Sequence, residues 1–155
     1  MKNIQQIYEM LSWENSPEIQ QKGIQLAKEI KDLSQLILPL SAPPSAWEAC
    51  ATILDGKSDE ELEPYLPELF DWINDINWPG GFVIFHRLLR FSGKRLRDPF
   101  IQCVEAILKQ NKEDDDRWLY SLSTLLENQE LKDLLPEKTV EILLIHRNQW
   151  ENWDS

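Results

Sequence analysis

The chain has 155 residues, a net charge of −11 at neutral pH, and 42% hydrophobic and 10% aromatic residues, including seven tryptophans. Its length and apolar content exclude an intrinsically disordered protein and predict a single domain over residues 1–155 with its own hydrophobic core. The excess of acidic residues argues against binding to nucleic acids and to anionic membrane surfaces, because both carry negative phosphates.

The two cysteines, Cys50 and Cys103, lie in apolar helical patterns, and neither has a second cysteine at the spacing of a metal site. We therefore expect them to pack in the core, and we expect no disulfide framework and no bound metal. No apolar run is long enough for a signal peptide or a membrane-spanning helix. The expected location is the cytoplasm.

Hydrophobic residues recur with a helical period along the N-terminal third of the chain, which predicts three helices. The first spans Ile4–Leu11. The second begins after an N-cap at Ser16 and keeps one apolar face as far as Leu33. A proline-rich loop then leads to a third helix, which Ser45 caps and Gly56 ends.

The middle of the chain predicts two further helices. Ser58 and Glu61 have the spacing of a capping box, and a helix with an apolar face follows. Pro79 is expected in the first turn of the next helix, which Gly93 ends as a C-terminal cap. The residues of this helix expected to face the core are Phe82, Phe85, Leu88 and Leu89.

In the C-terminal third, Asp98 and Pro99 are expected to open a helix. The acids of residues 113–116 end that helix and suit the start of the next one, and they lack the pattern of a calcium-binding loop. Pro136 starts the last helix, whose inward residues are expected to be Val140, Leu143 and Leu144. The centre of the whole core is expected to contain Trp72, Phe85, Leu89, Val104, Trp118 and Leu122.

The prolines Pro64, Pro99 and Pro136 are 35 and 37 residues apart, and apolar sets that superpose at an offset of 35 follow the first two. Repeats of this length are typical of stacked helical hairpins. The sequence therefore predicts an all-α fold of stacked antiparallel helical hairpins, a HEAT-like superhelix with slight right-handed curvature.

One stretch carries a family resemblance. The segment Leu-Glu-Pro-Tyr-Leu-Pro-Glu-Leu-Phe-Asp-Trp at 62–72 is followed by Asp-Ile-Asn-Trp-Pro at 75–79. These motifs resemble a group of small bacterial helical proteins of unknown function, and the resemblance extends from about Trp13 to Trp153. It implies an all-helical, HEAT-like protein of the bacterial cytoplasm, and it brings no catalytic residues.

Acidic residues gather on the outer face of the helix around residue 68: Glu60, Glu61, Glu63, Glu68, Asp71 and Asp75. Glu68, Asp71 and Asp75 are the candidate contacts for a basic protein, which such a surface attracts by long-range electrostatics. The alternative is that these acids are simply the solvent-facing side of a helix.

Cationic residues gather shortly afterwards. His86, Arg87 and Arg90 share one predicted helix face, and Lys94, Arg95 and Arg97 continue the run. This face is an alternative site for an anionic ligand, or for the substrate of an enzyme. The competing interpretation is that cations near a helix C-terminus are favoured by the helix dipole and balance nearby acids.

Three smaller features give weaker indications of a functional site. The stretch Trp78-Pro79-Gly80-Gly81 lacks the lysine and the preceding strand of a phosphate loop, so we expect a close helix approach there and no cofactor. The two histidines lack the spacing of metal ligands. Trp150 and Trp153 either pack on the last helices or form a contact patch.

Together these patterns predict a non-catalytic protein-interaction module with a basic protein partner, of the immunity or antitoxin type by analogy of size, charge and fold. The alternative is a small-ligand-binding protein or an enzyme that uses His86, Arg87 and Arg90.

Overall fold

The computed structural model describes residues 3–110, 112 and 115–151, and within these ranges it contains helices and turns but no strand. The α-helices are α1 (Ile4–Leu11), α2 (Pro17–Ala27), α3 (Trp47–Asp55), α4 (Asp59–Leu62), α5 (Leu66–Trp72), α6 (Gly81–Leu89), α7 (Gly93–Gln110), α8 (Asp115–Thr124), α9 (Gln129–Leu134) and α10 (Glu137–Glu151). Short 3-10 turns are η1 (Leu33–Leu36), η2 (Pro44–Ala46), η3 (Glu63–Tyr65), η4 (Ile73–Asp75) and η5 (Leu125–Glu127). The predicted all-α fold is confirmed.

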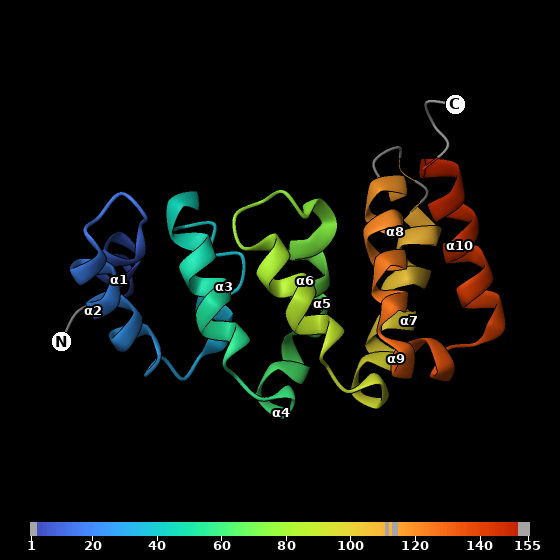
Figure 1. Ribbon diagram of the computed structural model, residues 1–155, viewed down its shortest axis with the longest axis horizontal. Coiled ribbons are helices and arrows are strands. Elements are labelled where there is room, and N and C mark those ends of the chain that lie inside the picture. Colours follow the sequence, from blue (N-terminus) through green and yellow to red (C-terminus); the bar gives the residue numbers. More distant parts are fainter. Residues whose placement is uncertain (1–2, 111, 113–114, 152–155) are drawn as a thin grey trace.

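The helices follow one another along the long axis of the molecule, with α1 and α2 at one end and α10 at the other (Figure 1). Helix α3 packs on α6, α5 packs on α7, and α8 packs on α10. Elements from neighbouring stretches of sequence are therefore neighbours in space. None of the described helices combines the length and the apolarity needed to cross a bilayer.

Local capping signals set several helix starts as predicted. The Ser16 hydroxyl accepts from the Ile19 amide at the start of α2. Ser58 and Glu61 form a reciprocal capping box at the start of α4, in which each side chain accepts from the other residue's backbone amide. Each such cap satisfies backbone groups that the first helical turn leaves without partners.

Two N-terminal predictions were wrong in detail. Helix α2 ends at Ala27, and Leu33 lies in the separate turn η1, where Asp32 accepts from the Ser34 amide and starts the new turn. Ser45 does not cap α3. It lies in η2, and its hydroxyl is instead 2.7 Å from the Ser12 hydroxyl. This bond ties the loop between α1 and α2 to the start of α3.

The predicted boundary around residues 90–99 was also wrong. Gly93 does not end α6; it is the first residue of α7, and Pro99 lies inside that helix rather than at its start. Proline at this position removes one backbone donor, to the Arg95 carbonyl. The first turns of α7 are nevertheless held by tertiary contacts, because Leu96 and Phe100 are fully buried.

The start of α7 receives its caps from distant residues. Asp59 accepts from the Ser92 amide at 2.9 Å, and Glu130 accepts from the Lys94 amide at 3.2 Å. Gly93 lies so close to α9 that a β-carbon on it would meet the Leu131 nitrogen at 2.5 Å. Glycine at this position therefore serves a close packing contact rather than a helix end.

The core prediction holds in part. Trp72, Val104 and Leu122 are buried, while Phe85, Leu89 and Trp118 are half-buried and pack against the core. The buried face of α6 is formed by Gly81, Ile84, Arg87 and Leu88. Phe82, expected to point inward, is 57% exposed. In α10, Leu143 is buried as expected, whereas Leu144 is exposed.

The turn before α6 fits its neighbours tightly. Pro79 precedes the helix instead of lying in its first turn, and Gly80 is the N-cap with a φ of 84°, a conformation that favours glycine. A β-carbon on Gly80 would lie 2.8 Å from the Ala51 β-carbon in α3. The Trp72 indole donates to the Pro79 carbonyl at 3.0 Å, which fixes the turn to α5.

Candidate functional site

The three predicted acidic contacts differ in their surroundings. Glu68 and Asp71 are exposed on the outer face of α5 and form no ion pair. Asp75, in η4, is half-buried, accepts from the Asn77 amide at 3.0 Å and lies 3.9 Å from Arg117. We call Glu68 and Asp71 the acidic surface of α5, and Asp75 belongs to the turn beneath it.

The acidic surface borders helix α7. Desolvation, and then the charge of Glu68, raises the pKa of Asp71. Desolvation, and then the charge of Asp71, raises the pKa of the Cys103 thiol to about 12. Burial likewise raises the pKa of Cys50 to about 12. Both cysteines are thus protonated at neutral pH and are poor nucleophiles.

The three predicted cationic residues do not share an exposed face. His86 and Arg90 are exposed, whereas Arg87 is buried. The Arg87 guanidinium lies 2.5 Å from the Asp59 carboxylate and donates to the Lys57 carbonyl at 3.0 Å. It also lies over the Phe91 ring, with its central carbon 5.2 Å from the ring centroid. Arg87 therefore links α6 to the start of α4.

Asp59 receives donors on both carboxylate oxygens. Burial alone would raise its pKa, but the hydrogen bonds from Arg87 and the Ser92 amide, together with the charges of Arg87 and Arg95, outweigh burial and lower the pKa. Asp59 is therefore ionised at neutral pH and joins three helices: its own α4, α6 through Arg87, and the start of α7 through Ser92.

The remaining arginines are also neutralised within the chain. Each of the six has an acidic partner: Arg87–Asp59, Arg90–Asp55, Arg95–Glu63, Arg97–Asp98, Arg117–Asp75 and Arg147–Glu151. Three of these pairs connect α6 or α7 to the α3–α5 region. Arg87 and Arg90 of the predicted anion-binding face are thus engaged in intramolecular ion pairs.

The histidines lie apart from any metal-binding arrangement. The His86 ring contacts the Phe85 ring, and His146 lies 3.5 Å from Asp116. Over residues 3–110, 112 and 115–151, no cluster of three or more His, Cys, Asp or Glu residues could hold a metal ion. Glu113 and Asp114 of the predicted acidic cluster lie outside the described residues.

The structure also forms a groove that the sequence patterns did not indicate. It has a volume of about 330 Å³ and is lined by Trp13, Glu48, Ile76, Asn77, Trp78, Pro79, Gly80, Phe82 and Val83. We call it the aromatic groove. Trp13 is 54% exposed and lies just after the apolar face of α1 ends at Leu11, which was the available sequence signal.

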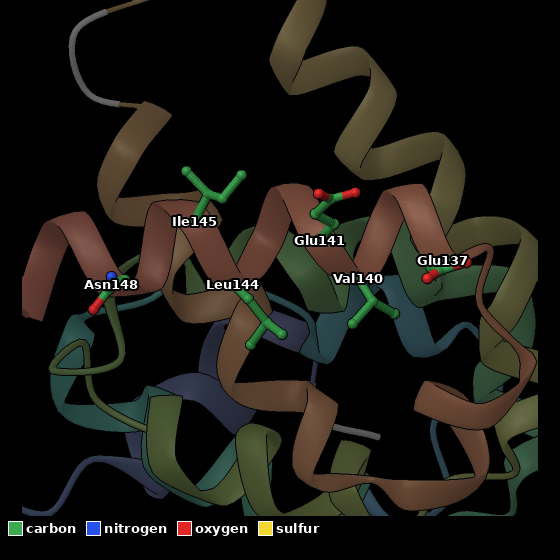
Figure 2. A pocket seen from close by; sticks show the side chains of 6 residues that line it. All are labelled: Glu137, Val140, Glu141, Leu144, Ile145 and Asn148. Carbon is green, nitrogen blue, oxygen red and sulfur yellow. The ribbon is translucent and has the colours of Figure 1, made fainter.

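A second depression lies on the outward face of α10. It has a volume of about 570 Å³ and is lined by Glu137, Val140, Glu141, Leu144, Ile145 and Asn148 (Figure 2). Nearby, Trp150 stacks on Tyr120 with 5.7 Å between ring centroids, so it packs on α8 while remaining 44% exposed. Trp153 lies outside the described residues.

Comparison with known proteins places this architecture in a family without assigning a role to it. No curated protein and no solved structure among those compared matches the chain. A family described as a domain of unknown function does match, over residues 48–153, a range that contains both α5 and α6. The resemblance noted in the sequence extended further, from about Trp13. Because the match covers more than half of the sequence, the chain belongs to this family, DUF5071.

Proposed function

We propose that this protein is a non-catalytic interaction module of the bacterial cytoplasm, a HEAT-like stack of helical hairpins that binds a basic protein through the acidic surface of α5. By analogy of size, charge and fold, the immunity or antitoxin type suits such a module. In that role the module blocks a basic partner by covering part of its surface.

The observation that carries this proposal is the distribution of charge. All six arginines have intramolecular acidic partners, while Glu68 and Asp71 have no cationic partner among the residues that the structure describes. Within the described part of the chain, the negative charge therefore comes mainly from acidic side chains that form no ion pair. A field of one sign steers an oppositely charged partner toward the surface and raises the association rate.

The raised pKa of Asp71 adds to this argument. Desolvation and the neighbouring Glu68 charge make the ionised form of Asp71 less favourable in the free protein. A cation close to the two carboxylates offsets that penalty, because opposite charges at close range favour the ionised form. A lysine or arginine of the partner would supply that cation.

The alternative, a ligand site or active site at His86, Arg87 and Arg90, has less support. Binding an anion there would have to compete with Asp59 and Asp55, which already accept from Arg87 and Arg90 at 2.5 and 2.6 Å. The Arg87–Asp59 pair is largely buried, and breaking such a pair costs about 3–5 kcal/mol, which binding of an anion would have to offset; the exposed Arg90–Asp55 pair costs less to break.

The proposal is tested by recovering the partner and measuring its association by stopped flow at two salt concentrations. The protein is used as affinity bait, and the retained protein is identified by mass spectrometry. We expect a basic protein whose association slows steeply as salt rises, since the Debye length is about 10 Å at 0.1 M and shorter above it.

Charge reversal supplies the matched comparison. The variant Glu68→Lys/Asp71→Lys should slow association by roughly tenfold, the scale of electrostatic steering. The control Glu9→Lys/Glu141→Lys makes the same change of net charge at exposed positions on α1 and α10, and it should have a much smaller effect. Equal slowing by both variants, or a rate that does not depend on salt, contradicts a localised acidic docking surface.

A further inference from the structure

The aromatic groove has walls that are fixed by hydrogen bonds. On one side, the Trp13 amide donates to the Ser45 carbonyl at 3.1 Å, next to the hydroxyl contact between Ser12 and Ser45. On the other side, the Trp72 indole holds the Pro79 carbonyl. The groove is therefore already formed in the free protein, which lowers the entropic cost of binding a ligand.

Aromatic side chains from two separate segments of the chain line this groove: Trp13 after α1, and Trp78 and Phe82 around the start of α6. Trp13 and Phe82 are 54% and 57% exposed, and Trp78, also in the lining, is half-buried. Trp47 contacts the Trp78 ring edge-on at 6.4 Å and supports it from the core side. Exposed, well-supported aromatic residues are the ones that most often dominate the energy of protein–protein contacts.

The indole donors divide into two groups. The N–H groups of Trp47, Trp72 and Trp118 donate to backbone carbonyls within the chain. Within the described part of the chain, the indole N–H groups of Trp13 and Trp78 have no hydrogen-bond acceptor. The groove thus offers two unused donors beside apolar rings.

Glu48 is the one charged residue in the groove lining. It lies in the first turn of α3, and it is exposed. A groove with a carboxylate and no cation favours a ligand that carries a positive charge, in agreement with the net charge of −11. The same charge opposes occupation of the groove by a second copy of this chain.

We propose that the aromatic groove binds an extended, proline-containing basic segment of a protein partner. In this arrangement the prolines pack against Trp13, Trp78 and Phe82. The indole N–H groups donate to carbonyls of the segment, and Glu48 pairs with its lysine or arginine. Polyproline II segments suit such a groove because they are already extended and leave their backbone carbonyls free for hydrogen bonds.

The groove is small, so it takes up only a short stretch of a partner. A volume of about 330 Å³ holds a few side chains and lies at the lower end of the range of ligand pockets, about 300–1,000 Å³. The inference rests on the proposed function in one respect, that the occupant is part of another protein. The groove and the acidic surface of α5 share no residues, so each can fail separately.

The test uses the full chain and four synthetic peptides. The first is a run of prolines flanked by arginines; the second replaces the arginines with glutamates, the third replaces the prolines with alanine and glycine, and the fourth is an amphipathic basic helix. Binding is followed in ¹H–¹⁵N spectra through the indole N–H signals of Trp13 and Trp78, which are assigned with Trp13→Phe and Trp78→Phe. We expect the first peptide alone to shift both signals strongly.

Substitutions in the groove then show which side chains contribute to the affinity for the first peptide. Trp13→Ala and Phe82→Ala should each weaken the first peptide by roughly tenfold or more, as expected of central aromatic contacts. Trp150→Ala, a similarly exposed tryptophan on α10, is the matched control and should leave affinity unchanged. Glu48→Gln should weaken binding and reduce its salt dependence. Because Trp13 and Phe82 are largely exposed, their variants should retain the thermal midpoint of the parent protein.

Three results would overturn the inference: no shift of either indole signal at millimolar peptide, an equal response to the alanine–glycine peptide, or equal weakening by Trp150→Ala. Preference for the helical peptide would assign the groove to a different kind of partner and would also refute the proposal. Basic peptides whose binding responds to Glu68→Lys/Asp71→Lys, and not to Trp13→Ala, would leave the proposed function standing while the groove inference fails.

Discussion

The Arg87 guanidinium in α6 lies 2.5 Å from the Asp59 carboxylate in α4, and the two side chains are 9% and 28% exposed. Arg90, the residue that follows the last residue of α6, pairs with Asp55 at 2.6 Å, but these two side chains are 57% and 36% exposed. The same kind of ion pair thus occurs twice near the end of α6, once largely buried and once at the surface.

This contrast predicts unequal effects of substitution. Arg87→Ala should lower the free energy of unfolding by about 3 kcal/mol, near the lower end for largely buried pairs, because it leaves Asp59 without its main partner. Arg90→Ala is the matched control and should cost less than about 1 kcal/mol. Urea unfolding followed by circular dichroism measures both values, and similar losses would show that the Arg87 pair has no special structural role.

The lowered pKa of Asp59 predicts how stability depends on pH. Because its pKa is lower in the folded than in the unfolded chain, its contribution is complete above the unfolded value of about 3.9 and is lost as pH falls through the folded pKa. Asp59→Asn should therefore be less stable than the parent protein at neutral pH, and the difference should shrink on acidification. Urea midpoints over a pH series test this.

The control for this series is Asp98→Asn, since Asp98 pairs with Arg97 but its side chain is 73% exposed. This variant should follow the pH profile of the parent protein closely. A constant difference between Asp59→Asn and the parent protein down to strongly acidic pH would contradict the role of the ionised Asp59.

Asp71 leads to the opposite expectation. Its pKa is raised in the folded chain, so ionisation of Asp71 costs stability at neutral pH, and this cost disappears below the unfolded pKa. Asp71→Asn should therefore stabilise the protein at neutral pH by a few tenths of a kcal/mol, the scale of like-charge helix neighbours.

Thermal midpoints at neutral and acidic pH measure this gain. The same variant should bind the basic partner more slowly, because the acidic surface loses one of its two charges. Greater stability together with slower binding would identify Asp71 as a residue retained for interaction. Lower stability at neutral pH would contradict the assigned pKa direction.

The turn at Gly80 and Gly81 predicts a steric effect. A β-carbon on Gly81 would clash with the Ile76 carbonyl, and one on Gly80 would meet Ala51 and would also require a φ that other residues rarely adopt. Gly81→Val and Gly80→Ala should each cost about 1–3 kcal/mol, as overpacked sites do. Gly56→Ala, with its nearest contact at 3.5 Å, should be neutral or slightly stabilising. A neutral Gly81→Val in thermal melts would contradict the close approach.

Features set by neighbouring residues were predictable from the sequence. The helical period gave the class of the fold, and the capping residues gave the starts of α2 and α4. The start of α7 could not be read in this way, because its caps come from Asp59 and Glu130, on other helices. Asp98 and Pro99 form a good local start signal that tertiary packing overrides.

The same distinction between local sequence and tertiary packing applies to the candidate site. The exposure of Glu68 and Asp71 follows from helical periodicity alone. The orientation of α6 does not, because apolar residues occupy more than one side of it, and the burial of Arg87 depends on Asp59, which comes from another helix. The aromatic groove could not be predicted from the sequence, because Trp13 and Phe82 are brought together only by the packing of α1, α3 and α6.

Asn128 links the end of α6 to the start of α9. Its buried side-chain amide donates to the carbonyls of Leu88 and Phe91 at the end of α6, and its carbonyl oxygen accepts from the Leu131 amide in α9. Opening either helix therefore breaks hydrogen bonds of the other. In hydrogen exchange, the amides at the end of α6 and the start of α9 should consequently become labelled in a single concerted event, although about forty residues separate them in the sequence.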